Sequence, residues 1–270
     1  MTENATPSLP PRYPVLATTI SATSPDEAVR LVLSFVAERS PRYLSVCPAD
    51  TILQCHDNPD LAAIVNGAAL AVPDGMPVVW LGRLRGLPVK RVYGPDLMLA
   101  LCDKGRASGV RHYFYGGTPE LLETLSARLA ARFPNLIIAG SWAPPFRPLT
   151  PDEEQAVTTR INVARPDIVW IGIGTPKQDY WIAHFRPVLD SPVLIPVGAA
   201  FNFHAGTVRQ APSVMQRMGL EWLFRLIMEP RRLWKRYLLG NPRFVFLVCR
   251  QWFSDRLLKH NRRPGKDKKP

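Results

Sequence analysis

Three apolar runs in the chain each end in a glycine-bearing loop. A buried strand of a parallel sheet has this pattern, because both of its faces are covered and its carboxyl end turns into a helix. Helical patterns occupy residues 120–133 and 151–164 between these runs. The alternation predicts an α/β fold, with a Rossmann-like parallel sheet and helices on both faces. The runs are residues 112–115 before Gly116, residues 167–171 before Gly172 and residues 192–197 before Gly198.

The region before these runs shows the same alternation on a smaller scale. Residues 43–47 predict another strand and residues 61–68 predict a helix. Residues 70–72 predict a short strand that stops at Pro73-Asp74-Gly75. Ligands of open α/β sheets bind outside the carboxyl ends of the strands. We therefore expect the loops that follow these strands to meet at one crevice.

The excess of basic residues is concentrated at the end of the chain. The formal net charge is +12 at pH 7, and residues 1–208 hold equal numbers of basic and acidic side chains. Residues 230–238 have helical spacing, with basic side chains on one face and Leu, Trp and Tyr on the other, and we expect this helix to end at Gly240-Asn241-Pro242. Segregated faces favour an anionic membrane surface as the partner. A nucleic-acid surface is the alternative, because arginine and aromatic side chains serve there too.

Charge and composition divide the chain into four parts. We expect a flexible leader at residues 1–13, the α/β catalytic domain at 14–208, a basic helical membrane-associating appendage at 209–260 and a disordered basic tail at 261–270. Residues 220–227 have the alternative of packing on the core. No run approaches the roughly 20 apolar residues of a membrane-spanning helix. The four cysteines form no Cys-x-x-Cys pair, which suits a reducing cytoplasm.

Asp74 is a candidate general base. It is the only carboxylate between Leu61 and Pro95, and it follows the end of an apolar strand. A carboxylate in that place can accept a proton from a substrate hydroxyl. It can equally cap the helix that follows, since Asp is a common N-cap. The spacing alone modestly favours the cap.

The loop at residues 172–178 is a candidate anion site. Gly172 and Gly174 let backbone N–H groups approach an anion, Lys177 adds a positive charge, and Gln178 offers a polar contact. The loop is neither Gly-x-Gly-x-x-Gly nor Walker A, because Lys177 follows Pro176 rather than a glycine. An ordinary tight turn between a strand and a helix explains it about as well.

Polar side chains also follow the run that ends at Gly198. Asn202 and His204 come shortly after it, and Arg209 follows. His204 is a candidate for binding a phosphate or protonating a leaving group, although an isolated histidine is more often structural. The sequence has no histidine pair at zinc-ligand spacing and no Asp-x-Asp triplet. We therefore expect no metal and no cofactor, and cationic side chains would have to stabilise a departing diphosphate.

Several ordered motifs between residues 43 and 240 resemble the WecG/TagA/CpsF glycosyltransferase family, also called glycosyltransferase family 26. The motifs are Pro73-Asp74-Gly75-Met76-Pro77-Val78-Val79-Trp80, Arg91-Val92-Tyr93-Gly94-Pro95-Asp96, Gly172-Ile173-Gly174-Thr175-Pro176-Lys177-Gln178, Val197-Gly198-Ala199-Ala200-Phe201, Gly219-Leu220-Glu221-Trp222-Leu223-Phe224-Arg225-Leu226 and Glu229-Pro230-Arg231-Arg232-Leu233.

The resemblance implies a metal-independent, inverting hexosyltransferase that moves a sugar from a UDP-sugar onto a sugar attached to a polyprenyl diphosphate. Such enzymes contribute to surface polysaccharides, including exopolysaccharides. They work on the cytoplasmic, inner face of the bacterial cell membrane as peripheral proteins. This implies an anionic membrane surface and no nucleic acid as partners, and leaves homo-oligomerisation open.

The resemblance also implies roles for individual residues. The aspartate that matches Asp74 is the proposed base in the family. Arginines near the C-terminus complete the site and engage the diphosphate. The donor-binding candidates are Ser45, Gly172, Gly174, Thr175, Pro176, Lys177, Gln178, Gly198, Asn202 and His204. The candidates for binding the diphosphate or the membrane are Arg209, Arg225, Arg231, Arg232, Lys235 and Arg236.

The chain departs from the family pattern at two places. Many members carry Thr-x-Asn at the end of an early strand, where this chain has Ser45 and Cys47, and Asn202 stands where an aspartate is frequent. These changes leave the donor open between a UDP-N-acetylmannosamine type and UDP-glucose. Outside the family, the alternative is a noncatalytic membrane or nucleic-acid binding module. A sugar-nucleotide epimerase is disfavoured because the sequence lacks a nicotinamide-binding fingerprint.

Overall fold

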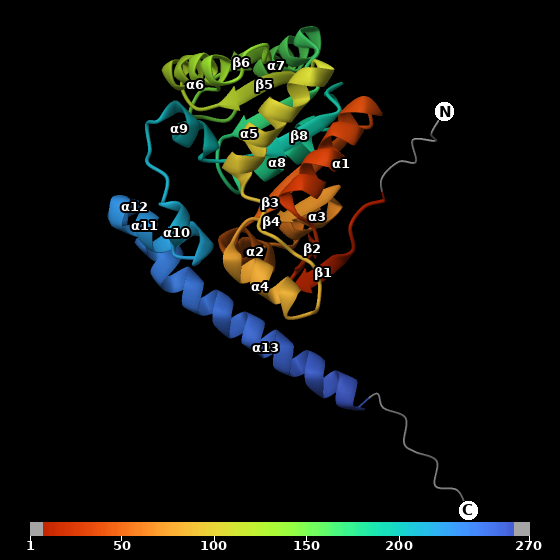
Figure 1. The fold of residues 1–270 in the computed structure, drawn as a ribbon, viewed down its shortest axis with the longest axis vertical. Coiled ribbons are helices and arrows are strands. Elements are labelled where there is room, and N and C mark those ends of the chain that lie inside the picture. Colours follow the sequence, from red (N-terminus) through yellow and green to blue (C-terminus); the bar gives the residue numbers. More distant parts are fainter. Residues whose placement is uncertain (1–7, 262–270) are drawn as a thin grey trace, which may run out of the picture.

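The computed structural model describes the backbone of residues 8–261 and the side chains of residues 8–254. Its centre is a parallel six-stranded sheet in the order β4-β3-β8-β7-β5-β6, with helices on both faces (Figure 1). A Rossmann-like α/β fold is therefore confirmed. The strands are β3 (Arg42–Cys47), β4 (Leu70–Pro73), β5 (Arg111–Gly116), β6 (Ile137–Trp142), β7 (Ile168–Gly172) and β8 (Val193–Pro196).

Alternate side chains of the strands pack into different cores. Phe114 and Trp170 point to one face, where they join the cluster under four helices. Tyr115 and Ile171 point to the other face and pack against two helices. Both faces are apolar because helices cover both, as the continuous apolar runs predict. The first group is α1 (Pro25–Ala37), α5 (Gly94–Lys104), α6 (Pro119–Arg132) and α9 (Ala200–Ala205), and the second is α7 (Pro151–Ala164) and α8 (Lys177–Phe185).

A smaller core lies beside β3 and β4. It contains an antiparallel hairpin, β1 (Arg12–Val15) and β2 (Thr18–Ser21), and three short helices. The expected leader, residues 1–13, overlaps the start of β1, where Tyr13 is buried; residues 1–7 lie outside the described residues. The helices are α2 (Ala49–Asp57), α3 (Pro59–Gly67) and α4 (Met76–Arg83), and a 3₁₀ turn, η1 (Gly105–Ser108), follows α5.

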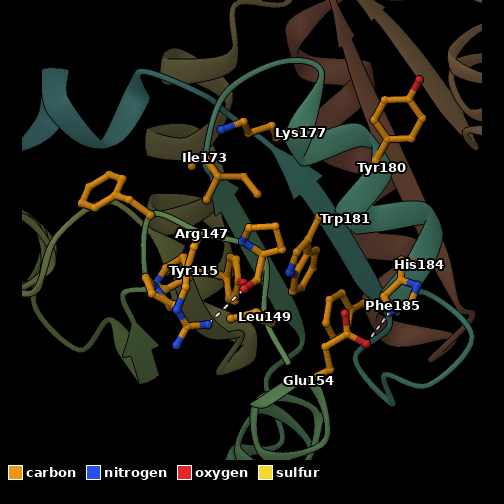
Figure 2. Close-up of a pocket in the computed structure, with 16 residues that line it drawn as sticks. Tyr115, Arg147, Leu149, Glu154, Ile173, Lys177, Tyr180, Trp181, His184 and Phe185 are labelled. Atoms are coloured by element: carbon orange, nitrogen blue, oxygen red, sulfur yellow. Dashed lines mark hydrogen bonds and ion pairs between the residues drawn. The ribbon is translucent and has the colours of Figure 1, made fainter. Parts of the chain in front are cut away.

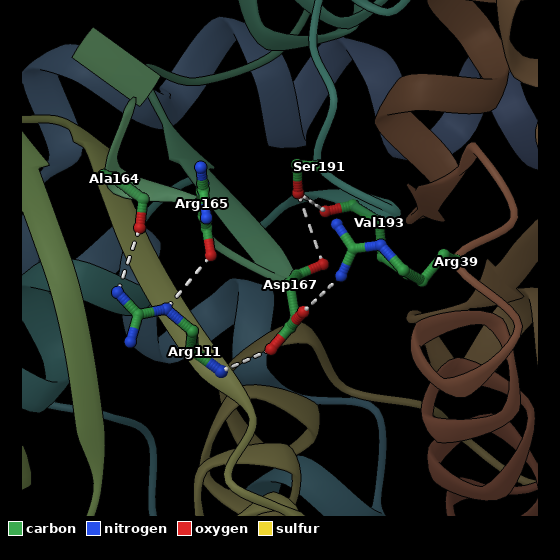
Figure 3. A network of polar contacts seen from close by, with 7 residues as sticks. All are labelled: Arg39, Arg111, Ala164, Arg165, Asp167, Ser191 and Val193. Carbon is green, nitrogen blue, oxygen red and sulfur yellow. Dashed lines mark hydrogen bonds and ion pairs between the residues drawn. The ribbon is translucent and has the colours of Figure 1, made fainter. Parts of the chain in front are cut away.

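Asp167 ties the amino ends of the strands together. Its Oδ2 accepts a hydrogen bond from the Arg111 backbone N–H at 2.9 Å, and its Oδ1 lies 3.4 Å from Nη1 of Arg39 (Figure 3). The Ser191 hydroxyl donates to the Asp167 carbonyl at 3.3 Å. These contacts stabilise the edge of the sheet opposite the strand-end loops, which leaves the carboxyl edge for binding.

The C-terminal segment differs from its sequence-based description. The prediction that a helix ends at Gly240-Asn241-Pro242 is wrong, because helix continues through these residues. Gly240 is right-handed helical, with φ −68° and ψ −46°, and α13 follows the preceding helical turn without a break. A π-helical turn directly precedes it. The elements are α10 (Ser213–Arg217), α11 (Glu221–Met228), α12 (Pro230–Trp234), η2 (Lys235–Leu239) and α13 (Gly240–Asn261).

Helix α13 packs on α2 and then projects past the body of the protein (Figure 1). Phe244 and Leu247 are buried in the small core. Arg243 forms a two-pronged ion pair with Asp57, at 2.6 and 2.5 Å. The expected disordered tail at residues 261–270 lies, apart from Asn261, outside the described residues.

Candidate active site

Asp74 lies directly after β4, at the carboxyl edge of the sheet. The interpretation of Asp74 as a helix cap finds no support, because Gly75 is the N-cap residue of α4 and no side chain caps that helix. The Asp74 side chain is 16% exposed. Its Oδ1 has no hydrogen-bond partner. This oxygen lies 3.6 Å from the Arg91 guanidinium and accepts no hydrogen bond, so it retains the capacity to accept one.

Arg91 lies between two carboxylates. Its Nη2 is 3.6 Å from Oδ1 of Asp74 and 2.5 Å from Oε2 of Glu221. Its Nε donates to the backbone carbonyl of Asp74. The Tyr93 hydroxyl donates to the other oxygen of Glu221 at 3.1 Å, and the guanidinium of Arg91 stacks 4.1 Å from the centre of the Tyr93 ring. Arg91 is therefore held mainly by Glu221.

The surroundings of Asp74 raise its pKa to about 7. Burial is the largest cause. The positive charge of Arg91 opposes the shift, the negative charge of Glu221 adds to it, and Arg225 and the Gly94 backbone N–H oppose it. A carboxyl with a pKa near neutrality is a stronger base than an ordinary aspartate and still titrates at working pH.

Two adjoining cavities meet at Asp74. One has a volume of about 230 Å³ and is lined by the loops after β7 and β8, including Gly174, Thr175 and Gln178. The other, of about 150 Å³, is bounded by the first turn of α4 and by the C-terminal segment. Asp74 and four other residues line both, so the base has access to two binding spaces. The four are Pro48, Glu221, Arg225 and Arg236.

Gln178 joins the two loops that line the larger cavity. Its Oε1 accepts a hydrogen bond from the Gly198 N–H at 3.0 Å, and its Nε2 donates to the Thr175 hydroxyl at 3.2 Å. Gly174 has φ +83° and open space around it, which suits close approach of a ligand to the backbone. Gly172 is different, because a Cβ there would lie 2.5 Å from the Phe201 ring. The glycine at 172 therefore serves packing.

The other donor-binding candidates do not line these two cavities. Lys177 lines a separate cavity of about 610 Å³ with Tyr115 and Trp181 (Figure 2). Asn202 donates to the Thr207 hydroxyl at 3.2 Å, and His204 is 3.0 Å from the Pro95 carbonyl. Burial lowers the pKa of His204. Pro176 precedes α8 as its N-cap residue, and Ser45 is buried within β3.

Three of the six basic candidates line the cavities, and three do not. Arg225 lies 5.9 Å from the centre of the Phe203 ring, and its Nε is buried without a hydrogen-bond partner. Nε of Arg236 is 3.1 Å from Oδ2 of Asp50, and Nη2 of Arg232 is 2.6 Å from Oε2 of Glu229. The side chains that line neither cavity are exposed: Arg209, Arg231 and Lys235.

Arg91, Tyr93 and Glu221 surround Asp74, and no role was predicted for them from sequence. All three lie in the motifs that resemble the WecG/TagA/CpsF family, and this was the feature of the sequence that could have indicated a role for them. The ion pair between Arg91 and Glu221 could not be predicted from sequence, because the two residues are 130 positions apart. Only the folded chain brings the carboxylate of α11 to the loop before α5.

Two further observations bear on the type of site. Among the described residues, no three His, Cys, Asp or Glu side chains are grouped so that they could hold a metal ion. Within the same part of the chain, every helix is too short or too polar to cross a membrane.

Comparison with known proteins decides the family. The model of the glycosyl transferase WecG/TagA/CpsF family matches residues 13–257. The chain belongs to this family. The N-acetylglucosaminyldiphosphoundecaprenol N-acetyl-beta-D-mannosaminyltransferase of Bacillus spizizenii is 31% identical over 237 residues, which cover 87% of this chain and 86% of that protein. The WecG/TagA/CpsF match includes both the strand-end loops and α11, so it spans every element that surrounds Asp74.

Proposed function

We propose that this protein transfers a sugar from a UDP-sugar to a sugar carried on a polyprenyl diphosphate, in surface polysaccharide biosynthesis. The observation that carries the proposal is the Asp74 carboxyl, which lines two adjoining cavities, has a pKa of about 7 and has one oxygen that accepts no hydrogen bond. Membership of the family supports the reaction class. The name of the Bacillus relative supports a lipid-diphosphate acceptor.

The transfer is a single displacement. Oδ1 of Asp74 accepts the proton of the acceptor hydroxyl, whose oxygen forms a bond with the anomeric carbon of the donor. The bond between that carbon and the UDP oxygen breaks, and UDP leaves with the electron pair. Attack opposite the leaving group inverts the anomeric configuration. The donor sugar occupies the larger cavity, near Gly174 and Gln178, and the acceptor enters through the smaller one.

Arginines from the C-terminal segment stabilise the departing diphosphate. Arg225, Arg232 and Arg236 line the larger cavity, and the buried Nε of Arg225 lacks a partner. Guanidinium groups bind phosphate oxygens with paired hydrogen bonds. Positive charge placed where negative charge develops lowers the barrier. We propose that these side chains take the place of a metal ion.

The C-terminal segment also attaches the protein to the inner face of the cell membrane. Ile227, Leu239 and Phe246 are each at least 60% exposed, and Arg231 and Lys235 are exposed on the same segment. Exposed apolar side chains enter the headgroup boundary, and each nearby Lys or Arg adds about 1 kcal/mol on an anionic leaflet. Attachment brings the cavities to a lipid-borne acceptor.

A donor screen with a lipid-linked acceptor tests the proposal. UDP-N-acetylmannosamine and UDP-glucose are the first donors, and N-acetylglucosamine on a polyprenyl diphosphate is the first acceptor. We expect transfer from one donor, with an inverted product. Absence of transfer from every UDP-sugar, together with vesicle or nucleic-acid binding, would show a noncatalytic module.

The variant Asp74→Asn tests the base. The amide keeps the shape of the side chain and cannot take up the proton, so turnover should fall about 10²–10⁴-fold. Glu123→Gln is the matched control, because Glu123 is exposed on α6. Full turnover of the Asp74 variant would refute the assignment.

A further inference from the structure

Glu221 occupies a position that no role in the transfer yet explains. It is the first residue of α11, it is 16% exposed, and both of its carboxylate oxygens are engaged. Oε2 holds Arg91 at 2.5 Å, and Oε1 accepts from Tyr93 at 3.1 Å. The two partners come from the loop before α5. Glu221 thus makes a direct ionic contact between the C-terminal segment and Arg91, which lies beside Asp74.

Arg91 has two carboxylates within reach and is closer to one of them. The distance from Nη2 is 2.5 Å to Glu221 and 3.6 Å to Asp74. A guanidinium pairs most strongly with the carboxylate that it contacts directly. If α11 were not seated, Asp74 would be the remaining carboxylate within 4 Å of Arg91 among the described side chains. A direct pair would then occupy the oxygen that has to accept the proton.

We propose that Glu221 is a positioning residue that holds Arg91 away from Asp74, so that the carboxylate of Asp74 is free to act as a base when α11 is seated. This inference rests on the proposed function of Asp74 as the base. It makes the C-terminal segment a condition of base strength as well as a source of phosphate-binding arginines.

The charges that face Asp74 fix the sign of the expected effect. Arg91 and Arg225 stabilise its ionised form, as does the Gly94 backbone N–H, whereas Glu221 opposes ionisation. The same cavities also hold Arg232, Arg236 and Asp50. Removing the charge of Glu221 leaves the cations less compensated, which lowers the pKa of Asp74. A carboxylate with a lower pKa is a weaker base.

The experiment compares the wild type with Glu221→Gln, measured as kcat/KM against pH. The acid limb of the wild type should lie near pH 7, and in the variant it should move to lower pH by about one unit, with a lower plateau. Glu221→Asp keeps the charge with a shorter reach, so its limb should lie between the two. If Glu221→Gln does not fold, the acid limb of Glu221→Asp still tests the inference. Glu123→Gln, the exposed control on α6, should match the wild type.

A direct titration separates this inference from the assignment of the base. The carboxyl of Asp74 is followed by carbon-13 NMR in full-length protein with labelled aspartate, assigned by the missing signal in Asp74→Asn. A lower pKa of Asp74 in Glu221→Gln supports the positioning role even if Asp74→Asn turns out active. An unchanged pKa and an unchanged acid limb overturn it, while loss of turnover in Asp74→Asn would leave the base assignment standing.

Discussion

At the scale of single residues, Asp74 and Asp179 illustrate two uses of a buried carboxyl. Burial raises the pKa of each to about 7. Asp74 opens onto two cavities, whereas Asp179, in the first turn of α8, is 2% exposed and lines neither of the two. The first arrangement suits proton transfer. The burial of Asp179 lowers the stability of the folded protein and gives its carboxyl no access to either cavity.

The pH dependence of transfer follows from Asp74. Its carboxyl must be ionised to accept a proton, so kcat/KM should fall as the pH decreases through about 7. The measurement is a pH series of initial rates with the lipid acceptor well below its KM, where the rate is proportional to kcat/KM. An acid limb near pH 4, the range of an unperturbed aspartate, would contradict the role of burial.

The variant Asp179→Asn should stabilise the protein at neutral and alkaline pH. The folded-state pKa of Asp179 is raised, so the wild type loses stability as the pH rises from about 4 to about 7, because over this range the carboxyl ionises in the unfolded chain while it stays protonated in the folded protein. The amide has no charge to bury. The variant should therefore gain on the order of 3 kcal/mol at pH 8 and little at pH 4, measured by thermal unfolding. A gain that is equal at both pH values would contradict this explanation.

At the scale of elements, the regular part of the fold was accessible from sequence. Residues 151–164 form the predicted helix, and Thr150 and Glu153 form a capping box at its start. The strand β6 was missed because it is an edge strand whose side chains are only partly buried, so it lacks the continuous apolar run. The end of the helix at residues 240–242 was misjudged, because Gly240 and Pro242 are local signals for a helix end, whereas the packing of Phe244 and Leu247 in the small core favours its continuation.

Helix α13 provides a test at this scale through two phenylalanines. Phe244 is 3% exposed and Phe246 is 65% exposed. We expect Phe244→Ala to lower the free energy of unfolding by about 3 kcal/mol, because it leaves a cavity under α13. Phe246→Ala should stay within about 0.5 kcal/mol of the wild type and weaken vesicle binding instead. Unfolding and vesicle sedimentation measure the two effects; equal stability losses would contradict the packing of α13.

At the scale of the whole molecule, the boundary between the neutral and the basic parts of the chain does not separate the candidate active site from the C-terminal segment, because both parts contribute residues to the cavities. The neutral residues 1–208 supply Asp74 and the strand-end loops, and the basic remainder supplies arginines to the cavities. The sequence predicted the strand-end loops as a site because parallel strands share one edge. Lys177 was expected beside them but lines another cavity, since the first turn of α8 directs it there. Long-range pairs such as Arg91 and Glu221 need the tertiary structure.

Anchoring and chemistry should be separable by charge. The double variant Arg231→Gln/Lys235→Gln removes exposed charges that line neither cavity, so vesicle binding should weaken while turnover on a water-soluble acceptor analogue is retained. Binding of the wild type should also weaken with salt, because the Debye length falls from about 10 Å at 0.1 M to about 3 Å at 1 M. Truncation after Val208 should abolish both activities. Turnover by the truncated chain would contradict the role of the arginines.

The segment from α11 to α13 has a consequence for how such a catalyst meets its substrate. The same stretch of chain covers the cavities at Asp74 and carries exposed aromatic residues, so the proposed membrane attachment would confine the reaction to a surface. Encounters then occur by lateral diffusion in two dimensions. The rate should follow the mole fraction of acceptor within the leaflet, and diluting the vesicles with inert lipid should slow the reaction even when the total amount of acceptor is unchanged.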